Sequence, residues 1–294
     1  SNASNPNRIG FISLTIHEGP KTRHASAIYL WRKVWRDGAN PHGMMNLTMN
    51  TNLQGRVALI TGGAVRLGQA LVERLADEGC KVVIHYRSSD APARRLQQRL
   101  KARGVAAVAV RARLDSQKAC EGLIKAALKA HGQLDILINS AAVFTKEPMG
   151  GMTGDSLQAA FWPNLFAPML LTQAFAAACA EGQVINLLDR RIASHDTACI
   201  PYLMTKKALA AFTEVSALAL APRIRVNAVA PGPVLPPPGQ GARYLRDHAG
   251  RLPLGRAPTT ADIADAVVAL LGSRSTTGQI VFVDGGQHLL GNGV

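Results

Sequence analysis

The chain has 294 residues, 47% of them hydrophobic, which suits one large folded domain, and no hydrophobic run reaches the roughly 18 residues that a membrane-spanning helix needs. Its 33 lysines and arginines exceed its 19 acidic residues, for a formal net charge of +14. The basic residues form no long block, so we favour an enzyme with dispersed surface charge that acts on a small molecule over a protein that binds nucleic acid or a membrane.

The first 50 residues differ from the rest of the sequence. Residues 1–3 read Ser-Asn-Ala, which is typical of the remnant of a cleaved tag, and the first methionine is Met44. A basic arm, a targeting peptide and sequence upstream of a native start are three alternatives for this segment. We predict a non-catalytic extension over residues 1–50 and a single domain over residues 51–294.

From residue 54 onward the chain alternates between strand and helix patterns. Short hydrophobic, β-branched runs predict strands at 56–61, 81–85, 105–110, 134–139, 184–188, 224–229 and 279–283. Helical periodicity predicts helices at 66–77, 91–103, 116–131, 155–180, 202–220 and 261–271. Hydrophobic strands that alternate with helices predict the α/β class: one doubly wound parallel sheet of about seven strands, with helices on both faces.

A glycine-rich turn follows the first predicted strand and opens the first predicted helix. It reads Thr61-Gly62-Gly63-Ala64-Val65-Arg66-Leu67-Gly68. Glycines let a backbone approach a pyrophosphate closely, and the N-terminus of a helix favours negative charge. Because ligands of open α/β sheets bind at the carboxyl ends of strands, the turn predicts a dinucleotide site. A plain tight turn is the alternative.

The end of the second predicted strand bears on the choice of cofactor. It reads His85-Tyr86-Arg87-Ser88, without the acidic residue that commonly binds the ribose of NAD. Arg87 is suited to bind a 2′-phosphate, with Ser88 as a hydrogen-bond donor, and Arg66 adds a second cation. The sequence therefore favours NADPH, unless both arginines are solvated surface residues.

Tyr202 and Lys206 are four residues apart in a predicted helix, so they lie on one face about one turn from each other. A nearby ammonium lowers the pKa of a phenol, which predicts that Tyr202 gives or takes a proton near neutral pH. This spacing is common by chance, and its meaning depends on the motifs that accompany it.

Further motifs occur in a fixed order along the chain. Leu114-Asp115 follows the third predicted strand, Asn139-Ser140-Ala141-Ala142 follows the fourth, and Asn164 lies in the long helix. With the glycine-rich turn, YLMTK at 202–206, RVNAVAPGPV at 225–234 and VDGG at 283–286, they resemble the short-chain dehydrogenase/reductase family. The resemblance covers about residues 53–290.

The resemblance implies a Rossmann-like fold and a role for each matching residue. It implies that Tyr202 is the proton donor, that Lys206 binds the nicotinamide ribose and that Asn164 holds a water relay. It implies that Asp115 contacts adenine and Asn139 supports the cofactor. The full set of implied cofactor-binding residues is Gly62, Arg66, Leu67, Gly68, His85, Tyr86, Arg87, Ser88, Leu114, Asp115, Asn139, Ala141, Lys206, Pro231, Gly232 and Val234.

One departure from the family pattern points to a subfamily. Most members have a serine thirteen residues before the tyrosine, where this chain has Asp189. An ionised carboxylate cannot donate a hydrogen bond to a carbonyl, but it accepts from the N–H groups of an amino-pyrimidine ring. It can also help Tyr202 deliver a proton to a ring nitrogen. Asp189, Arg66 and the ending DGGQHL at 284–289 resemble the pteridine reductase branch, which includes bacterial dihydrofolate and dihydromonapterin reductases.

Two other positions differ from that branch. Pteridine reductases place a ring that stacks on the pterin four residues after the asparagine, where this chain has Val143, and Phe144 comes one residue later. Pteridine reductases also have a serine two residues after this asparagine, which contacts the cofactor and the pterin, and this chain has Ala141 there. Either Phe144 replaces the stacking ring, or the substrate is not a pterin. Phe144 as a core aromatic and Asp189 as a helix cap or ion-pair partner are the structural alternatives.

The leading hypothesis is an NADPH-dependent reductase of a C=N bond in a pterin-like ring. Tyr202, Asp189 and Lys206 deliver the proton, and Arg66, Phe144, Asp189 and Tyr202 form the substrate site. The loop over 233–254 is expected to close over the substrate. A carbonyl or 3-oxoacyl reductase is the first alternative, and an NADP-binding sensor without catalysis is the second. No metal site is expected.

The surroundings of the protein are predicted from weaker signals. The cysteines Cys80, Cys120, Cys179 and Cys199 have neither zinc-ligand nor redox-pair spacing, which predicts free, buried thiols in the cytoplasm. The resemblance implies a homotetramer or a dimer formed through the helices at about 155–180 and 202–221.

Overall fold

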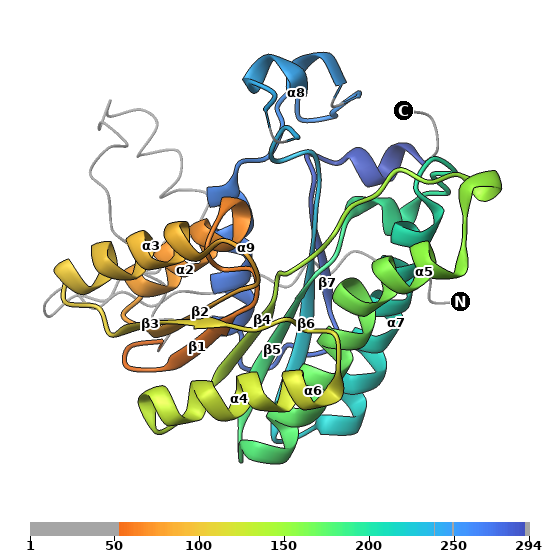
Figure 1. Ribbon diagram of the computed structural model, residues 1–294. Coiled ribbons are helices and arrows are strands. Elements are labelled where there is room, and N and C mark those ends of the chain that lie inside the picture. The colour runs from red at the N-terminus through yellow and green to blue at the C-terminus, as the bar shows by residue number, and fades with distance from the viewer. Residues whose placement is uncertain (1–52, 238, 249, 292–294) are drawn as a thin grey trace, which may run out of the picture. The chain divides into compact units, whose positions relative to one another are not determined.

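The computed structural model describes residues 53–237, 239–248 and 250–291, so the predicted extension over residues 1–50 lies outside the described part. The strands pair in parallel in the order β3-β2-β1-β4-β5-β6-β7 (Figure 1). They are β1 (Val57–Ile60), β2 (Lys81–Tyr86), β3 (Ala107–Arg111), β4 (Ile136–Asn139), β5 (Gly182–Leu187), β6 (Ile224–Pro231) and β7 (Ile280–Val283). The predicted doubly wound sheet of seven strands is confirmed.

Helices cover both faces of the sheet. In Figure 1, α2, α3 and α9 lie on one face, and α4, α6 and α7 lie on the other. The α-helices of the described part are α2 (Arg66–Asp77), α3 (Asp90–Ala102), α4 (Gln117–His131), α5 (Gly154–Phe161), α6 (Ala167–Ala178), α7 (Ile200–Leu220), α8 (Ala242–His248) and α9 (Thr260–Gly272). Short helical turns are η1 (Met149–Gly151), η3 (Arg190–Ala193) and η4 (Gln287–Leu290).

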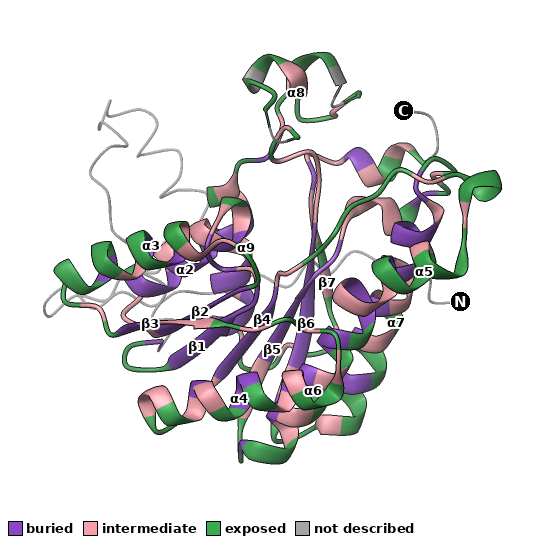
Figure 2. Ribbon diagram, in the orientation of Figure 1, coloured by how far each residue is buried: buried purple, intermediate pink, exposed green. Residues whose placement is uncertain are grey.

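The hydrophobic run in β1 explains why both faces are covered. Successive residues of a strand point to opposite faces. Val57 and Leu59 pack into the core on one side, and Ala58 and Ile60 pack into the core on the other. All four are fully buried, and Figure 2 shows the central strands as buried along most of their length.

The predicted helix over 155–180 is helical through residue 178, but it is not a single regular α-helix. The segment forms α5, then a π-helical turn η2 (Trp162–Phe166), then α6. Pro163 and Pro168 lack the N–H that an α-helix uses and crowd the preceding turn, which favours a wider turn between two shorter helices. The turn carries Asn164, which is fully buried.

A side chain of the first turn ties together the loops that follow β1 and β4. These neighbouring strands lie at the point where the strand order reverses, which is where doubly wound sheets open a crevice. Thr61 Oγ1 accepts hydrogen bonds from the backbone N–H groups of Ser140 (2.9 Å) and Ala141 (3.0 Å). The glycine-rich turn and the loop after Asn139 are thus held as one unit.

The long loop after β6 lies over the carboxyl edge of the sheet (Figure 1). It contains α8, a helix that the sequence interpretation missed. Arg66 Nη2 donates to the backbone carbonyl of Pro236 (2.7 Å) at one end of the loop, and the Leu254 N–H donates to the Gly285 carbonyl (3.0 Å) at the other. Both ends of the predicted covering loop are therefore fixed to the domain.

Candidate active site

A cavity of about 880 Å³ opens at the switch point of the sheet. Most of the predicted cofactor-binding residues contribute to it. Those that line it are Gly62, Arg66, Leu67, Gly68, His85, Tyr86, Arg87, Ser88, Leu114, Asp115 and Ala141. Residues from the ends of three strands and from the turn between them thus meet in one crevice, as the glycine-rich turn predicts.

Two glycines of the turn are required by close packing. A Cβ on Gly68 would lie 2.1 Å from the Gly62 carbonyl oxygen, closer than any side chain tolerates. A Cβ on Gly62 would lie 3.0 Å from Ala141 Cα, and Gly62 also has a φ of +64°, which favours glycine. The turn can therefore present bare backbone to the cavity, which fits a pyrophosphate.

His85 supports the turn and has no hydrogen-bonding atom left for a cofactor. Its Nδ1 accepts from the Gly62 N–H (3.2 Å), and its Nε2 lies 3.1 Å from the Ala112 carbonyl oxygen. Since a carbonyl only accepts, Nε2 carries the proton and the ring is neutral. Burial lowers the pKa of His85 to about 4, which preserves this state at neutral pH. His85 thus lines the cavity, and its two ring nitrogens hold the turn in place.

Arg87 and Arg113 line the cavity after the ends of β2 and β3. Arg87 and Ser88 are exposed at the end of β2, where a 2′-phosphate is expected. Tyr86 is less available, because its hydroxyl donates to Asp90 Oδ1 (2.6 Å). Asp115 forms an exposed ion pair with Arg113 (2.7 Å). The cavity, the bare turn and the exposed Arg87, which has no ion pair within the described residues, together fit a phosphorylated dinucleotide.

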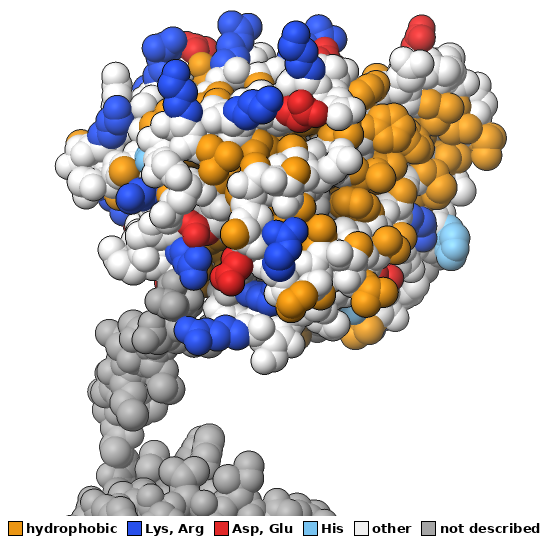
Figure 3. Space-filling view, turned by 90° about the horizontal axis from the view of Figure 1, so that it is seen from below, with side chains coloured by type: hydrophobic (Ala, Val, Ile, Leu, Met, Phe, Trp, Pro, Cys, Tyr) orange, Lys and Arg blue, Asp and Glu red, His pale blue; other side chains and the backbone are white. Residues whose placement is uncertain are grey.

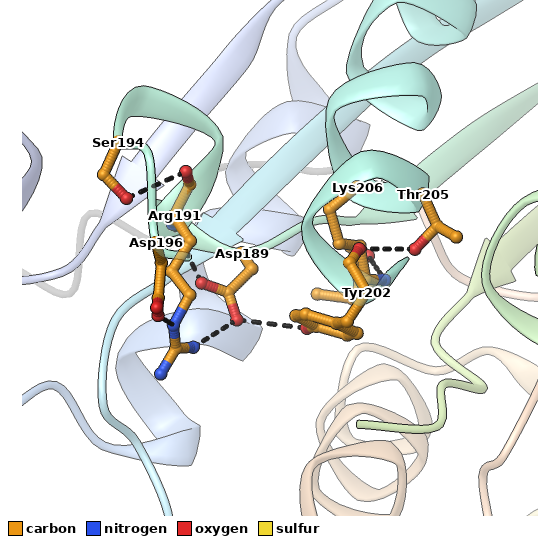
Figure 4. Close-up of polar contacts among 8 residues, drawn as sticks. Asp189, Arg191, Ser194, Asp196, Tyr202, Thr205 and Lys206 are labelled. Carbon is orange, nitrogen blue, oxygen red and sulfur yellow. Dashed lines mark hydrogen bonds and ion pairs between the residues drawn. The ribbon is translucent and has the colours of Figure 1, made fainter. Parts of the chain in front are cut away.

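Tyr202 and Asp189 meet at the carboxyl edge of the sheet. Tyr202, in the first turn of α7, donates from Oη to Oδ2 of Asp189 (3.0 Å), which lies two residues after the end of β5 (Figure 4). Tyr202 is 6% exposed, and burial and the Asp189 carboxylate raise its pKa well above the ordinary value. The net shift of this pKa is therefore upward, opposite to the lowering that the spacing of Tyr202 and Lys206 predicts. Spacing alone did not show that a carboxylate accepts the phenol proton.

Lys206 points to the backbone rather than to the phenol oxygen. Its Nζ donates to the Leu187 carbonyl (2.7 Å) and lies 5.8 Å from the centre of the Tyr202 ring. Burial lowers the pKa of Lys206 to about 8. Most Lys206 side chains are therefore charged at neutral pH, and the charge lies near the Tyr202 ring.

Phe144 lies at the mouth of the site and is not a core residue. It is 47% exposed, and its ring packs edge-to-face on the Tyr202 ring, with 4.9 Å between the centroids. The neighbouring Val143 is held by Asn164, whose side-chain amide both accepts from its N–H and donates to its carbonyl (2.8 Å each). The Asn164 amide thus fixes the shape of this loop through one donated and one accepted hydrogen bond.

Asn139 lies beneath the site and does not line the cavity. Its Nδ2 donates to Asn186 Oδ1 (2.9 Å), and within the described part of the chain its buried Oδ1 has no hydrogen-bond partner. Pro231, Gly232 and Val234 lie at and after the end of β6, also outside the cavity lining. Gly232 packs against Asp284, where a Cβ would approach the Asp284 Cα to 2.7 Å.

Two charged residues beside Asp189 were missed from the sequence. Arg191, in η3, pairs with Asp189 and with Asp196 (3.0 Å each). Ser194 closes the same turn by donating to the Arg191 carbonyl (3.1 Å), as Figure 4 shows. In the sequence, the pair is indicated only by the position of Arg191 two residues after Asp189. That position does not specify the direction of the arginine side chain.

The comparisons with known proteins agree with this geometry. A family model described as enoyl-(acyl carrier protein) reductase matches residues 63–288. The chain belongs to the short-chain dehydrogenase/reductase family. Among the described residues, no helix is long and hydrophobic enough to cross a membrane, and no group of side chains could hold a metal ion.

The relatives span several substrates. Pteridine reductase 1 of Leishmania tarentolae is 31% identical over 286 residues, covering 82% of this chain and 99% of the relative. L-xylulose reductase of Bos taurus is 34% identical over 252 residues, covering 81% and 98%. The structure of FolM alternative dihydrofolate reductase 1 from Brucella canis complexed with NADP has a TM-score of 0.77 and 35% identity, covering 81% of this chain and 96% of that one.

Proposed function

We propose that this chain is an NADPH-dependent reductase that transfers hydride to the C=N bond of a pterin-like ring, of the dihydropteridine or dihydrofolate type. The observation that carries the proposal is the hydrogen bond from Tyr202 Oη to Asp189 Oδ2 (3.0 Å). A carboxylate at this place accepts an N–H group but cannot donate to a carbonyl oxygen, which favours a ring nitrogen over a ketone as the group that it faces.

The cofactor assignment is supported by the cavity and by the solved relatives. We propose that Arg87 and Ser88 bind the 2′-phosphate and that the turn from Gly62 to Gly68 binds the pyrophosphate. Leu114, Asp115, Asn139, Ala141, Pro231, Gly232 and Val234 are proposed as the remaining cofactor contacts or supports. Two FolM structures from Brucella contain NADP, and a metagenomic blue fluorescent protein contains NADPH. When bound there, NADPH supplies the hydride.

Tyr202 is the proposed proton donor. Its raised pKa keeps the hydroxyl protonated at neutral pH, which is the form that an acid needs. The proton moves from Tyr202 Oη to the ring nitrogen of the substrate, since that nitrogen gains electron density when its C=N bond is reduced. The charged form of Lys206, 5.8 Å from the tyrosine ring, stabilises the phenolate that is left.

The pterin-like substrate is supported by the aromatic ring of Phe144 beside Tyr202. The half-exposed ring of Phe144 provides a flat hydrophobic surface beside Tyr202, suited to stacking on a heterocycle. Two of the similar proteins, a pteridine reductase and an alternative dihydrofolate reductase, are named for substrates of this class.

A carbonyl or 3-oxoacyl reductase is the alternative function. It is favoured by Ala141 and Val143, which stand where the pteridine reductase pattern has a serine and an aromatic ring. The relatives L-xylulose reductase and a putative ketoacyl reductase of Streptomyces violaceoruber belong to this side of the family. An NADP-binding sensor without catalysis is the third candidate.

Substrate competition separates these candidates. NADPH oxidation is measured with dihydrobiopterin, dihydrofolate and a short 3-oxoacyl thioester. We expect turnover of at least one pterin and none of the thioester, and turnover of the thioester alone would refute the pterin proposal. Tyr202→Phe is expected to lose about 100-fold or more in kcat while NADPH binding is retained, since only the proton donor is removed. Unchanged turnover in this variant contradicts its role as the acid.

We further propose a homotetramer or dimer formed through α6 and α7. Hydrophobic side chains gather on the right of Figure 3, the side on which Figure 1 places α5, α6 and α7. On these helices Val215 is 66% and Leu218 is 84% exposed, and Phe166 and Met169 are partly exposed beside them. Sedimentation of the wild-type protein and of Leu218→Glu tests this, since the charge should dissociate the assembly.

Two further assignments are proposals about the whole protein. We propose a cytoplasmic location, which the four free, buried cysteines support. We also propose that residues 51–294 form the catalytic domain and residues 1–50 an extension without a catalytic role. A chain that begins at Met44 is therefore expected to keep kcat and the KM for NADPH within about twofold, and a larger loss would assign the extension a role.

A further inference from the structure

One arginine links two carboxylates to the aromatic wall of the site. The Arg191 guanidinium donates from Nη1 to Asp189 Oδ2 and from Nε to Asp196 Oδ2, each at 3.0 Å. It also lies over the Phe144 ring, 5.2 Å from the centroid, within cation–π range. Figure 4 shows Arg191 between the two carboxylates, with Tyr202 on the other side of Asp189. Arg191 therefore contacts both Asp189 and Phe144, two of the groups that contact Tyr202.

The arginine also joins the two ends of one connection. Asp189 lies two residues after the end of β5, and Asp196 precedes α7, where it accepts from the Ala198 N–H (3.0 Å). The chain of contacts from Asp189 through Arg191 to Asp196 thus spans the segment that leads from β5 to Tyr202. The Arg191 side chain is 29% exposed, and that of Asp189 is 15% exposed, so the first pair is largely shielded from solvent.

The contacts of Arg191 and Tyr202 together use most of the accepting capacity of Asp189. A carboxylate has about four lone-pair sites. Oδ1 accepts from the Arg191 backbone N–H (2.9 Å), and Oδ2 accepts from Arg191 Nη1 and from Tyr202 Oη (3.0 Å each). One site, on Oδ1, is left for a substrate. Paired N–H groups of an amino-pyrimidine edge bind both oxygens of a carboxylate. They therefore need an accepting site on Oδ2 as well as the one that is left on Oδ1.

We propose that Arg191 is a positioning residue that limits Asp189 to one N–H group of the substrate and holds Phe144 against Tyr202. This inference rests on the proposed function, because it concerns how a pterin-like ring meets Asp189. While Arg191 is in place, Asp189 supports Tyr202 and cannot form a fork with an amino-pyrimidine edge. Removal of the arginine side chain frees the second site on Oδ2.

Two measurements on Arg191→Met test the proposal. We expect kcat for dihydrobiopterin to fall about tenfold or more, because Asp189 and Phe144 lose their fixed positions. We expect the Kd of 2,4-diaminopyrimidine for the enzyme–NADPH complex, measured by calorimetry, to fall about tenfold, because a charge-assisted fork becomes possible. A residue that serves only the fold would weaken both properties together.

Three further variants sharpen the test. Arg191→Lys keeps the charge but lacks the planar guanidinium fork, so both values should lie between those of the wild type and Arg191→Met. Adding Asp189→Asn to Arg191→Met should remove the gain in diaminopyrimidine affinity, since an amide has one acceptor oxygen. Arg99→Met is the matched control, because Arg99 pairs with Glu73 on the far surface of α2 and α3, and it should change both values less than twofold.

The outcomes separate this inference from the proposed function. Unchanged kcat in Arg191→Met, or no gain in diaminopyrimidine affinity, overturns the role of Arg191. The binding measurement requires no turnover. If the wild-type enzyme reduces the 3-oxoacyl thioester but neither dihydrobiopterin nor dihydrofolate, the proposed function fails, and the binding measurement still decides whether Arg191 restricts Asp189.

Discussion

Arg66 and Pro236 are 170 positions apart in the chain, yet the Arg66 guanidinium donates to the Pro236 carbonyl at 2.7 Å. The bond joins the glycine-rich turn to the loop that lies over the carboxyl edge of the sheet. Arg66 is also the only described non-glycine residue with a positive φ, +55°, a conformation that costs an L-residue roughly 1–2 kcal/mol. The turn therefore holds a strained residue whose side chain reaches the covering loop.

Replacement of Arg66 by glycine is expected to separate these two effects. Relief of the positive φ should raise the free energy of unfolding by about 1 kcal/mol relative to Arg66→Ala. Both variants lose the bond to Pro236, so both should raise the KM for NADPH several-fold and speed proteolysis within the loop over 233–254. Thermal unfolding and limited proteolysis measure the two effects. Equal stability of the two variants would contradict the strain argument.

Removal of the Arg87 side chain should change the choice between cofactors. Arg87→Ala is expected to raise the KM for NADPH about tenfold or more, since a charge-assisted contact with the 2′-phosphate is lost. The KM for NADH, which lacks that phosphate, should change less than twofold. Steady-state kinetics with both cofactors provide the measurement. A parallel rise for NADH would place Arg87 elsewhere on the dinucleotide.

A methyl group at Gly68 should block the dinucleotide crevice. Its Cβ would lie 2.1 Å from the Gly62 carbonyl oxygen, so Gly68→Ala must displace the turn. We expect NADPH affinity, measured by fluorescence titration, to fall at least tenfold. Gly122→Ala is the matched control, since a Cβ there meets nothing within 4 Å in α4. That variant should keep its affinity and gain about 1 kcal/mol in stability. Equal affinity in both variants would contradict this reading of the turn.

The burial of Lys206 predicts the basic limb of the pH profile. Its pKa is lowered to about 8, so the charged form dominates below pH 8 and is lost as the pH rises through this value. If the charge supports the Tyr202 phenolate, kcat/KM should fall above about pH 8. Arg stays charged throughout, so Lys206→Arg should lower the maximum but move this limb at least one unit upward. An unmoved limb would assign it to another group.

The seven parallel strands, the glycine-rich turn and the pairing of Tyr202 with Asp189 were predictable from local patterns. A continuous hydrophobic run such as Val57–Ile60 predicts a strand that is buried on both faces. A motif at the carboxyl end of such a strand is expected to lie in the ligand crevice. The protonation of Tyr202 was not predictable from spacing, because it depends on burial and on which oxygen of Asp189 the hydroxyl meets.

Other features depend on side-chain direction, which a sequence pattern does not specify. Arg191 follows a strand end, where either solvent or the site could receive its guanidinium. His85 was assigned to the cofactor because of its place in a motif, but its ring turns inward to the Gly62 N–H. The π-helical turn η2 is marked in the sequence by Pro163. The hydrophobic periodicity continues on both sides of this proline and therefore favours one uninterrupted helix.

The protonation of His85 limits the stability of the crevice at acid pH. One nitrogen accepts from Gly62 and the other donates to Ala112, so only the neutral imidazole satisfies both partners. The folded-state pKa of about 4 lies below the ordinary value of 6.5, so protons bind the unfolded chain first as the pH falls. As the pH falls from about 6.5 to about 4, the contribution of His85 to the free energy of unfolding is therefore lost. This residue supports the turn that would hold the pyrophosphate. Nucleotide affinity and resistance to acid thus depend on the same proton.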